Sequence, residues 1–167
     1  YSLCNVAFAR LNTNGTLDPS LSGDGKVITD FGSGNNGGAD LIMQGGKILV
    51  IGYSHDGTSY NATVYRYLSN GNLDPTFSGD GIRPINFGAE DYLSGVALYS
   101  GKIYVTGYSQ TSDFSASDII TARLNSNGTL DTTFSGDGRV KTNLGTNDYG
   151  FDLAISGGKV VVAGKSD

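Results

Sequence analysis

Acidic residues in glycine-rich loops are the side chains of this sequence best suited to chemistry. The tetrapeptide Ser-Gly-Asp-Gly occurs three times in the 167 residues, and a carboxylate in such a loop is an oxygen ligand of the kind that calcium accepts. The three aspartates are Asp24, Asp80 and Asp137. Their surroundings lack the spacing of an EF-hand loop, so calcium is one of two interpretations of these residues.

The other interpretation is structural, because aspartate side chains in turns accept hydrogen bonds from nearby backbone N–H groups. A second set of aspartates is spaced so that each can pair with an arginine of its own copy: Arg10 with Asp18, Arg66 with Asp74, and Arg123 with Asp131. An element that is identical in every copy favours a role in folding over a single binding site. We therefore expect these residues to be structural, and we expect no cofactor.

His55 and Cys4 are the only histidine and the only cysteine of the sequence. His55 lies in a predicted loop, without a nucleophile or metal-ligand partner at a meaningful spacing, so we expect a surface residue. Cys4 cannot form an internal disulfide, and we expect a buried free thiol, with an intermolecular bridge as the alternative. No pair of carboxylates and no nucleophile with a base is unique to one copy, so we do not expect an enzyme.

One frame recurs three times along the chain. Ser22, Ser78 and Ser135 open the three Ser-Gly-Asp-Gly copies, at spacings of 56 and 57 residues. Each copy follows an Asn-Gly and a Leu-Asp pair, and a Gly-Lys pair with an apolar run recurs at the same period. Such a period is typical of folds in which one supersecondary unit stacks on the next.

Four short strands fit into one unit. The strands predicted in the middle unit span residues 41–43, 48–53, 62–68 and 82–87. Gly45-Gly46 lies between the first two and predicts a tight hairpin. Pro84 in the fourth suits an outer edge, because proline has no N–H to donate to a neighbouring strand. Four antiparallel strands per unit predict an all-β fold, a β-propeller of four-stranded blades.

The third copy carries a resemblance to a known family. Residues 122–138 read Ala-Arg-Leu-Asn-Ser-Asn-Gly-Thr-Leu-Asp-Thr-Thr-Phe-Ser-Gly-Asp-Gly, and elsewhere Gly-Gly-Lys precedes an apolar run that ends in Gly-Tyr-Ser. This pattern closely resembles the delta-60 repeat, a bacterial β-propeller family, over essentially the whole chain. The resemblance implies a propeller in a secreted or surface-attached protein, with its secretion signal outside this sequence and with no established activity.

The two ends of the sequence resemble complementary halves of one blade. The expected boundaries are a half-blade over 1–32, blades over 39–87 and 92–144, and a half-blade over 149–167. These make three blade-equivalents, whereas closed propellers typically need four or more. The half-blades would leave unpaired edges that bind copies of the same chain. Three arrangements stay open: a six-bladed dimer, a filament, or a segment of a longer propeller.

Composition narrows the partners. The net charge of −5 offers no basic surface for phosphates, so we expect no nucleic-acid partner. No apolar stretch is long enough for a transmembrane helix, so we expect no insertion into a membrane.

Two functions fit a chain of this kind. The first is a structural module of the cell surface or extracellular space that assembles by completing blades between chains. The second is a lectin-like propeller that binds a glycan or a protein through loops that vary between copies. The candidate contacts in these loops are His55, Tyr60, Tyr92 and Tyr149.

Overall fold

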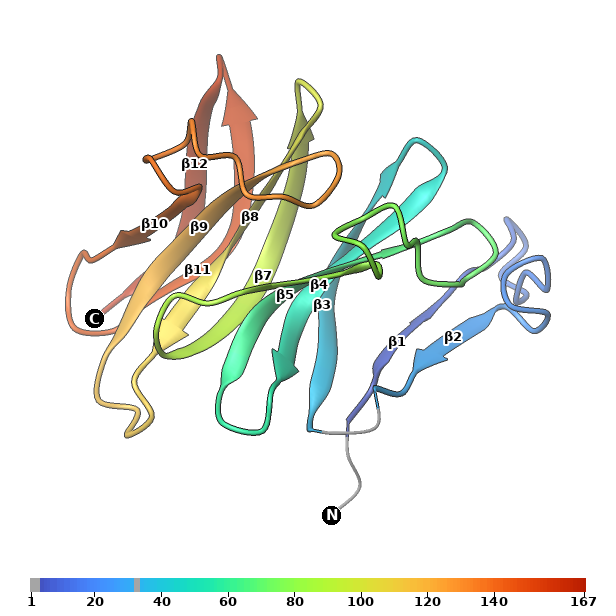
Figure 1. The fold of residues 1–167 in the computed structure, drawn as a ribbon, viewed down its shortest axis with the longest axis horizontal. Coiled ribbons are helices and arrows are strands. Elements are labelled where there is room, and N and C mark those ends of the chain that lie inside the picture. Colours follow the sequence, from blue (N-terminus) through green and yellow to red (C-terminus); the bar gives the residue numbers. More distant parts are fainter. Residues whose placement is uncertain (1–3, 32–33) are drawn as a thin grey trace.

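Twelve strands and no helix make up the computed structural model, which describes residues 4–31 and 34–167 (Figure 1). No helix that could cross a membrane occurs in this part of the chain. The strands are β1 (Val6–Ala9), β2 (Lys26–Thr29), β3 (Asn36–Gln44), β4 (Lys47–His55), β5 (Tyr60–Tyr67), β6 (Ile82–Ile85), β7 (Glu90–Tyr99), β8 (Lys102–Gln110), β9 (Ser117–Asn125), β10 (Arg139–Thr142), β11 (Asp148–Ser156) and β12 (Lys159–Ser166).

The strands form four antiparallel sheets. Strands β3 to β6 make the first sheet and β7 to β10 the second, each in sequence order, which confirms the prediction of all-β structure with four-stranded antiparallel sheets. Strands β1 and β2 form the N-terminal strand pair, and β11 and β12 form the C-terminal strand pair. None of these sheets closes on itself. Tyr1 to Leu3 and Gly32, which the predicted first half-blade includes, lie outside the described residues.

Glycine-containing turns join the first and second strands of each unit. Gly45 and Gly46 connect β3 to β4 with φ angles of 56° and 83°, and positive φ at both central residues is the signature of a type I′ hairpin turn. The apolar run that follows, Ile48 to Ile51, is fully buried in β4. The predicted hairpin is therefore confirmed, although β3 begins three residues before the predicted start of its blade.

Each first strand contains a β-bulge. The register shifts between Gly38 and Asp40 in β3, and between Leu93 and Gly95 in β7. The shift recurs in β11. A bulge adds one residue to one strand and increases the local twist. Pro84 in β6 pairs with Thr63 in β5. It therefore lies in the edge strand of the first sheet, as its missing N–H predicts.

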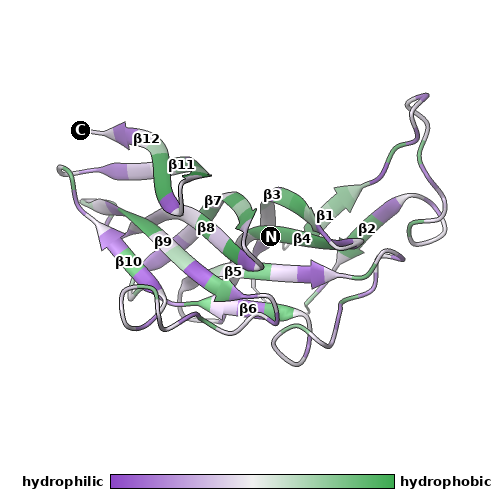
Figure 2. Cartoon of the chain, turned by 90° about the horizontal axis from the view of Figure 1, so that it is seen from above, coloured by the Kyte–Doolittle hydropathy of each residue, from purple (hydrophilic) through white to green (hydrophobic). Residues whose placement is uncertain are grey.

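The sheets stack face to face in an open, curved row (Figure 2). Leu49 and Val64 of the first sheet pack with Val105 and Ile120 of the second in the larger apolar core. A smaller core joins the N-terminal strand pair to the other face of the first sheet. The two strand pairs lie at opposite ends of the row in both views (Figures 1 and 2), so they do not complete each other within one chain.

Candidate functional site

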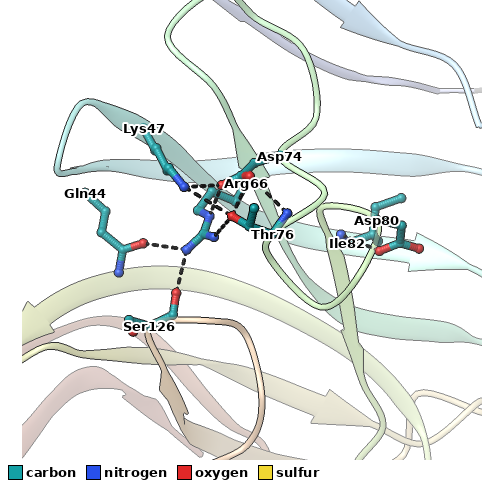
Figure 3. Close-up of polar contacts among 8 residues, drawn as sticks. All are labelled: Gln44, Lys47, Arg66, Asp74, Thr76, Asp80, Ile82 and Ser126. Carbon is teal, nitrogen blue, oxygen red and sulfur yellow. Dashed lines mark hydrogen bonds and ion pairs between the residues drawn. The ribbon is translucent and has the colours of Figure 1, made fainter.

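A buried ion-pair cluster joins Asp74, in the loop between the third and fourth strands of the first sheet, to Lys47 in β4 and Arg66 in β5 (Figure 3). Arg66 Nε donates to Asp74 Oδ2 at 2.7 Å, and Lys47 Nζ lies 2.7 Å from the same oxygen. The Arg66 and Asp74 side chains are only 6% and 1% exposed. Thr76 Oγ1 donates to the second carboxylate oxygen at 2.7 Å, so both oxygens of the buried anion have partners.

The Arg66 guanidinium also links the first sheet to the second. Its Nη1 donates to Gln44 Oε1 within its own sheet and to the backbone oxygen of Ser126 in the turn after β9 (Figure 3). Its carbon lies 4.6 Å from the ring centre of Phe77, which is a cation–π contact. Arg66 is therefore positioned to hold the loop and the neighbouring sheet together.

The predicted arginine–aspartate pairs are present in all three copies, but the copies differ in their cations. In the second sheet, Asp131 pairs with Arg123 at 2.8 Å and with Lys102 at 2.9 Å. In the N-terminal strand pair, Asp18 pairs with Arg10 alone at 2.8 Å, among the described residues. The copy of the cluster in the N-terminal strand pair thus lacks a lysine among the described residues.

These contacts lower the pKa of the paired carboxyls. Burial alone would raise the pKa of Asp74, but hydrogen bonds from Lys47 and Thr76 and the charge of Arg66 hold it well below its usual range. The hydroxyl of Thr133, followed by Lys102, lowers the pKa of Asp131. The carboxylates of the cluster are therefore ionised at neutral pH.

We expect the protein to lose stability in acid because of this cluster. A carboxyl with a lowered pKa binds fewer protons in the folded than in the unfolded state, so its contribution is complete above about pH 4 and is lost as the pH falls through its folded pKa. The Asp74→Asn variant should be less stable at pH 7. Between pH 4 and 2 its unfolding free energy should fall less steeply with pH, and the difference in slope should correspond to the uptake of up to about one proton on unfolding. Urea unfolding at a series of pH values measures both quantities. An unchanged slope would contradict the lowered pKa.

The Ser-Gly-Asp-Gly aspartates form Asx turns. Oδ1 of Asp24, Asp80 and Asp137 accepts the backbone N–H of the residue two positions later, at 2.9 Å in each case. Among residues 4–31 and 34–167, no three acidic, histidine or cysteine side chains gather as metal ligands. The turn accounts for the aspartate in each loop.

The predicted ligand tyrosines come together, but in strands and not in loops. Tyr60, Tyr92 and Tyr149 lie in β5, β7 and β11 and join Tyr53 and Tyr108 in one row of half-buried rings, called here the tyrosine row. Neighbouring ring centres are 4.9 to 5.5 Å apart. The strands extend beyond the apolar runs from which they were predicted, so these tyrosines lie in strands and not in loops.

His55 was also expected in a loop, but it ends β4, where its ring centre lies 4.7 Å from that of Tyr60. Much of the ring surface in the tyrosine row is used for packing. Contact of these residues with a glycan or a protein stays a prediction.

Cys4 is exposed, so the prediction of a buried thiol is wrong. The corresponding residues of the two four-stranded sheets, Tyr60 and Ser117, pair with the second strand of their sheet, at His55 and Gln110. The N-terminal strand pair has no such strand. Cys4 is left uncovered for this reason.

Two sets of residues were missed in the sequence. Lys47 and Lys102 were noted only as part of a repeated Gly-Lys pair, although they recur in step with the aspartates that they bind.

Asp91 and Asp148 are fully buried and accept N–H groups from the connection between sheets, such as that of Phe87 at 2.6 Å. Burial raises the pKa of Asp91. Their spacing of 57 residues is the signal that could have identified them.

Comparison with known proteins supports the repeat. No curated protein matches the chain. A family model described as "Domain of unknown function (DUF5122) beta-propeller" matches residues 5–21, 46–77 and 100–134, which together cover half of the chain. Each matched segment contains a third strand and the loop with its arginine–aspartate pair. The chain therefore belongs to the DUF5122 beta-propeller family.

Proposed function

We propose that this chain is a non-enzymatic structural module that associates with copies of itself. The C-terminal strand pair of one copy joins the N-terminal strand pair of another and completes a four-stranded blade, so that the chain contributes three blade-equivalents. The resemblance to the delta-60 repeat supports a place outside the cell or on its surface, in a bacterial protein.

The observation that carries this proposal is the pair of open strand edges. Strands β4 and β8 have a neighbour on both sides, whereas β12 pairs only with β11, and β1 only with β2, among the described residues. Open edges present unpaired N–H and C=O groups to another strand. The chain therefore offers the second strand of a blade at one end and the third strand at the other.

Exposed apolar side chains accompany these edges. Val161 in β12 is 58% exposed, whereas the corresponding Leu49 and Tyr104 are 0% and 4% exposed. Leu41 in β3 is 46% exposed, whereas the corresponding Val96 is 7% exposed. Val96 packs against the preceding sheet, and Leu41 lacks the first two strands of such a sheet. A second copy would bury these side chains.

We expect the Val161→Lys variant to weaken self-association. Val161 is exposed in the single chain, so the change should leave folding intact, while it removes a side chain whose burial contributes about 1.5 to 3 kcal/mol, or roughly a ten- to hundredfold change in dissociation constant. Light scattering over a range of concentrations measures the effect. A closed dimer would have twice the 17.4 kDa chain mass, and a filament would grow with concentration.

Ile28→Lys is the matched control. Ile28 is 70% exposed in β2, and the corresponding residue of the second sheet is a lysine, Lys141. This variant should associate like the unchanged chain. The proposal fails if the unchanged chain stays a monomer at all concentrations, or if both lysine variants lose association equally.

A further inference from the structure

The lysine that opens the second strand has an aspartate partner in two of the three copies. Lys47 lies 2.7 Å from Asp74, and Lys102 lies 2.9 Å from Asp131. In both cases the lysine belongs to the second strand, and the aspartate follows the third strand of the same sheet. The ion pair therefore forms only where the second and third strands lie side by side.

The lysine and the aspartate that remain, Lys159 and Asp18, lie at opposite ends of the chain. Lys159 opens β12 and forms no ion pair within the part of the chain that the structure describes. Asp18 follows β1, and Arg10 is its only cationic partner in the same residues. Joining the strand pairs of two copies would supply each with the partner that it lacks.

Strand β8 gives the register of this joint. Its pairing with β9 begins with Lys102 opposite Asn125, and Lys102 Nζ donates to Asn125 Oδ1 at 2.6 Å. The corresponding residues of the joint are Lys159 in one copy and Asn12 in the other. A slip of one residue would turn every side chain of the added strand to the opposite face, so the exposed apolar residues favour this register.

A second contact joins neighbouring sheets. The backbone oxygen of Asn127, in the turn after β9, accepts the N–H of Ser78 at 2.8 Å. Gly128 of the same turn, at a φ of 91°, lies so close to the Phe77 ring that a Cβ there would be 2.9 Å from it. The corresponding Asn70-Gly71 turn packs on Leu21 of the N-terminal strand pair in the same way.

The remaining Asn-Gly turn, Asn14-Gly15, has no sheet to pack against within residues 4–31 and 34–167. Gly15 has a φ of 85°, like the other two glycines, but nothing would lie within 4 Å of a Cβ there. At the other end of the chain, Arg123 and Phe134 take the places of Arg66 and Phe77 and line a cavity of about 460 Å³ together with β12. This cavity is where the turn of a following unit would pack.

We infer that a second copy of this chain docks on the first in one register, through two specific contacts. Lys159 of one copy pairs with Asp18 of the other within the completed blade. The Asn14-Gly15 turn of the second copy fills the cavity beside Phe134 of the first. This inference rests on the proposed self-association and names its partner and its contacts.

Interchain disulfide formation tests the register. Gln110 lies opposite Ser117 in the second sheet. Asp167 corresponds to Gln110 and Cys4 to Ser117, so the same register places Asp167 of one copy opposite the exposed Cys4 of the other. A chain with Cys4→Ser and Asp167→Cys is mixed with the unchanged chain and oxidised glutathione. Directly opposed residues have Cα atoms about 4.5 to 5.5 Å apart, which is within disulfide range.

The matched control carries Cys4→Ser and Ser166→Cys, because neighbouring strand residues point to opposite faces. We expect the mixed disulfide to form at least about fivefold faster with Asp167→Cys than with the control. Lys159→Met should also weaken association by about tenfold, whereas Lys26→Met, on the outer strand β2, should not.

Equal rates with the two introduced thiols, or an unchanged affinity of the Lys159→Met variant, would overturn the inferred register. If the unchanged chain still associates in that case, blade completion stands and only the contacts are wrong. If the unchanged chain stays a monomer, the proposed function itself fails.

Discussion

The Gly107→Ala variant is expected to lose at least about 3 kcal/mol of unfolding free energy, or to fail to fold. Gly107 pairs with Leu93 at the bulge of β7, and this bulge brings the Tyr92 carbonyl oxygen against the Gly107 Cα. A Cβ at this position would overlap with that oxygen and with the Leu93 backbone. The two strands would have to separate in the middle of a buried sheet.

Gly101→Ala is the matched control for this prediction. Gly101 lies in the turn just before the same strand, at a φ of 73°, and no described atom lies within 4 Å of a Cβ placed there. Its replacement should cost only about 1 to 2 kcal/mol, the strain of a side chain in the left-handed region. Thermal and urea unfolding of both variants give the comparison, and equal losses would show that the bulge does not require glycine.

The second large effect is expected at Arg66. Arg66→Met keeps most of the side-chain length but leaves Asp74 buried without its guanidinium and removes the link to Ser126. Removing one partner of a buried ion pair costs about 3 to 5 kcal/mol, because the other charge stays buried. We expect a loss of that size in the unfolding free energy, measured by urea unfolding at pH 7.

Arg10→Met provides the control in the same sequence context. The Arg10 and Asp18 side chains are 32% and 23% exposed, so water can replace the lost guanidinium. This variant should lose distinctly less stability than Arg66→Met. The double variant Arg66→Met with Asp74→Leu should recover part of the loss, because no buried carboxylate then remains. No recovery would indicate that packing of the arginine stem is the main contribution.

Local features of the fold were predictable from the sequence. The Gly45-Gly46 turn, the apolar run after it and the edge position of Pro84 depend on residues close to one another in the chain. The pairing of Arg66 with Asp74 was predictable because both recur at a fixed spacing.

Non-local features were not predictable in the same way. Cys4 was expected to be buried because its counterparts begin paired strands, yet its exposure depends on a strand that the N-terminal strand pair lacks. Tyr92 contacts Tyr60, and Tyr149 contacts Tyr108, through the stacking of sheets, which no spacing along the chain reveals. The partner of Lys47 was missed because the Gly-Lys pair was used only as a marker of the repeat.

The stacked arrangement also bears on how such a chain can evolve. The two junctions on either side of the first sheet each use one Asn-Gly turn and one arginine, so duplication or deletion of a whole unit creates no new kind of contact. Gene recombination can therefore change the number of units in steps of 56 or 57 residues without redesign of any interface. An insertion of any other length inside a paired strand would shift the register and separate the lysine from its aspartate.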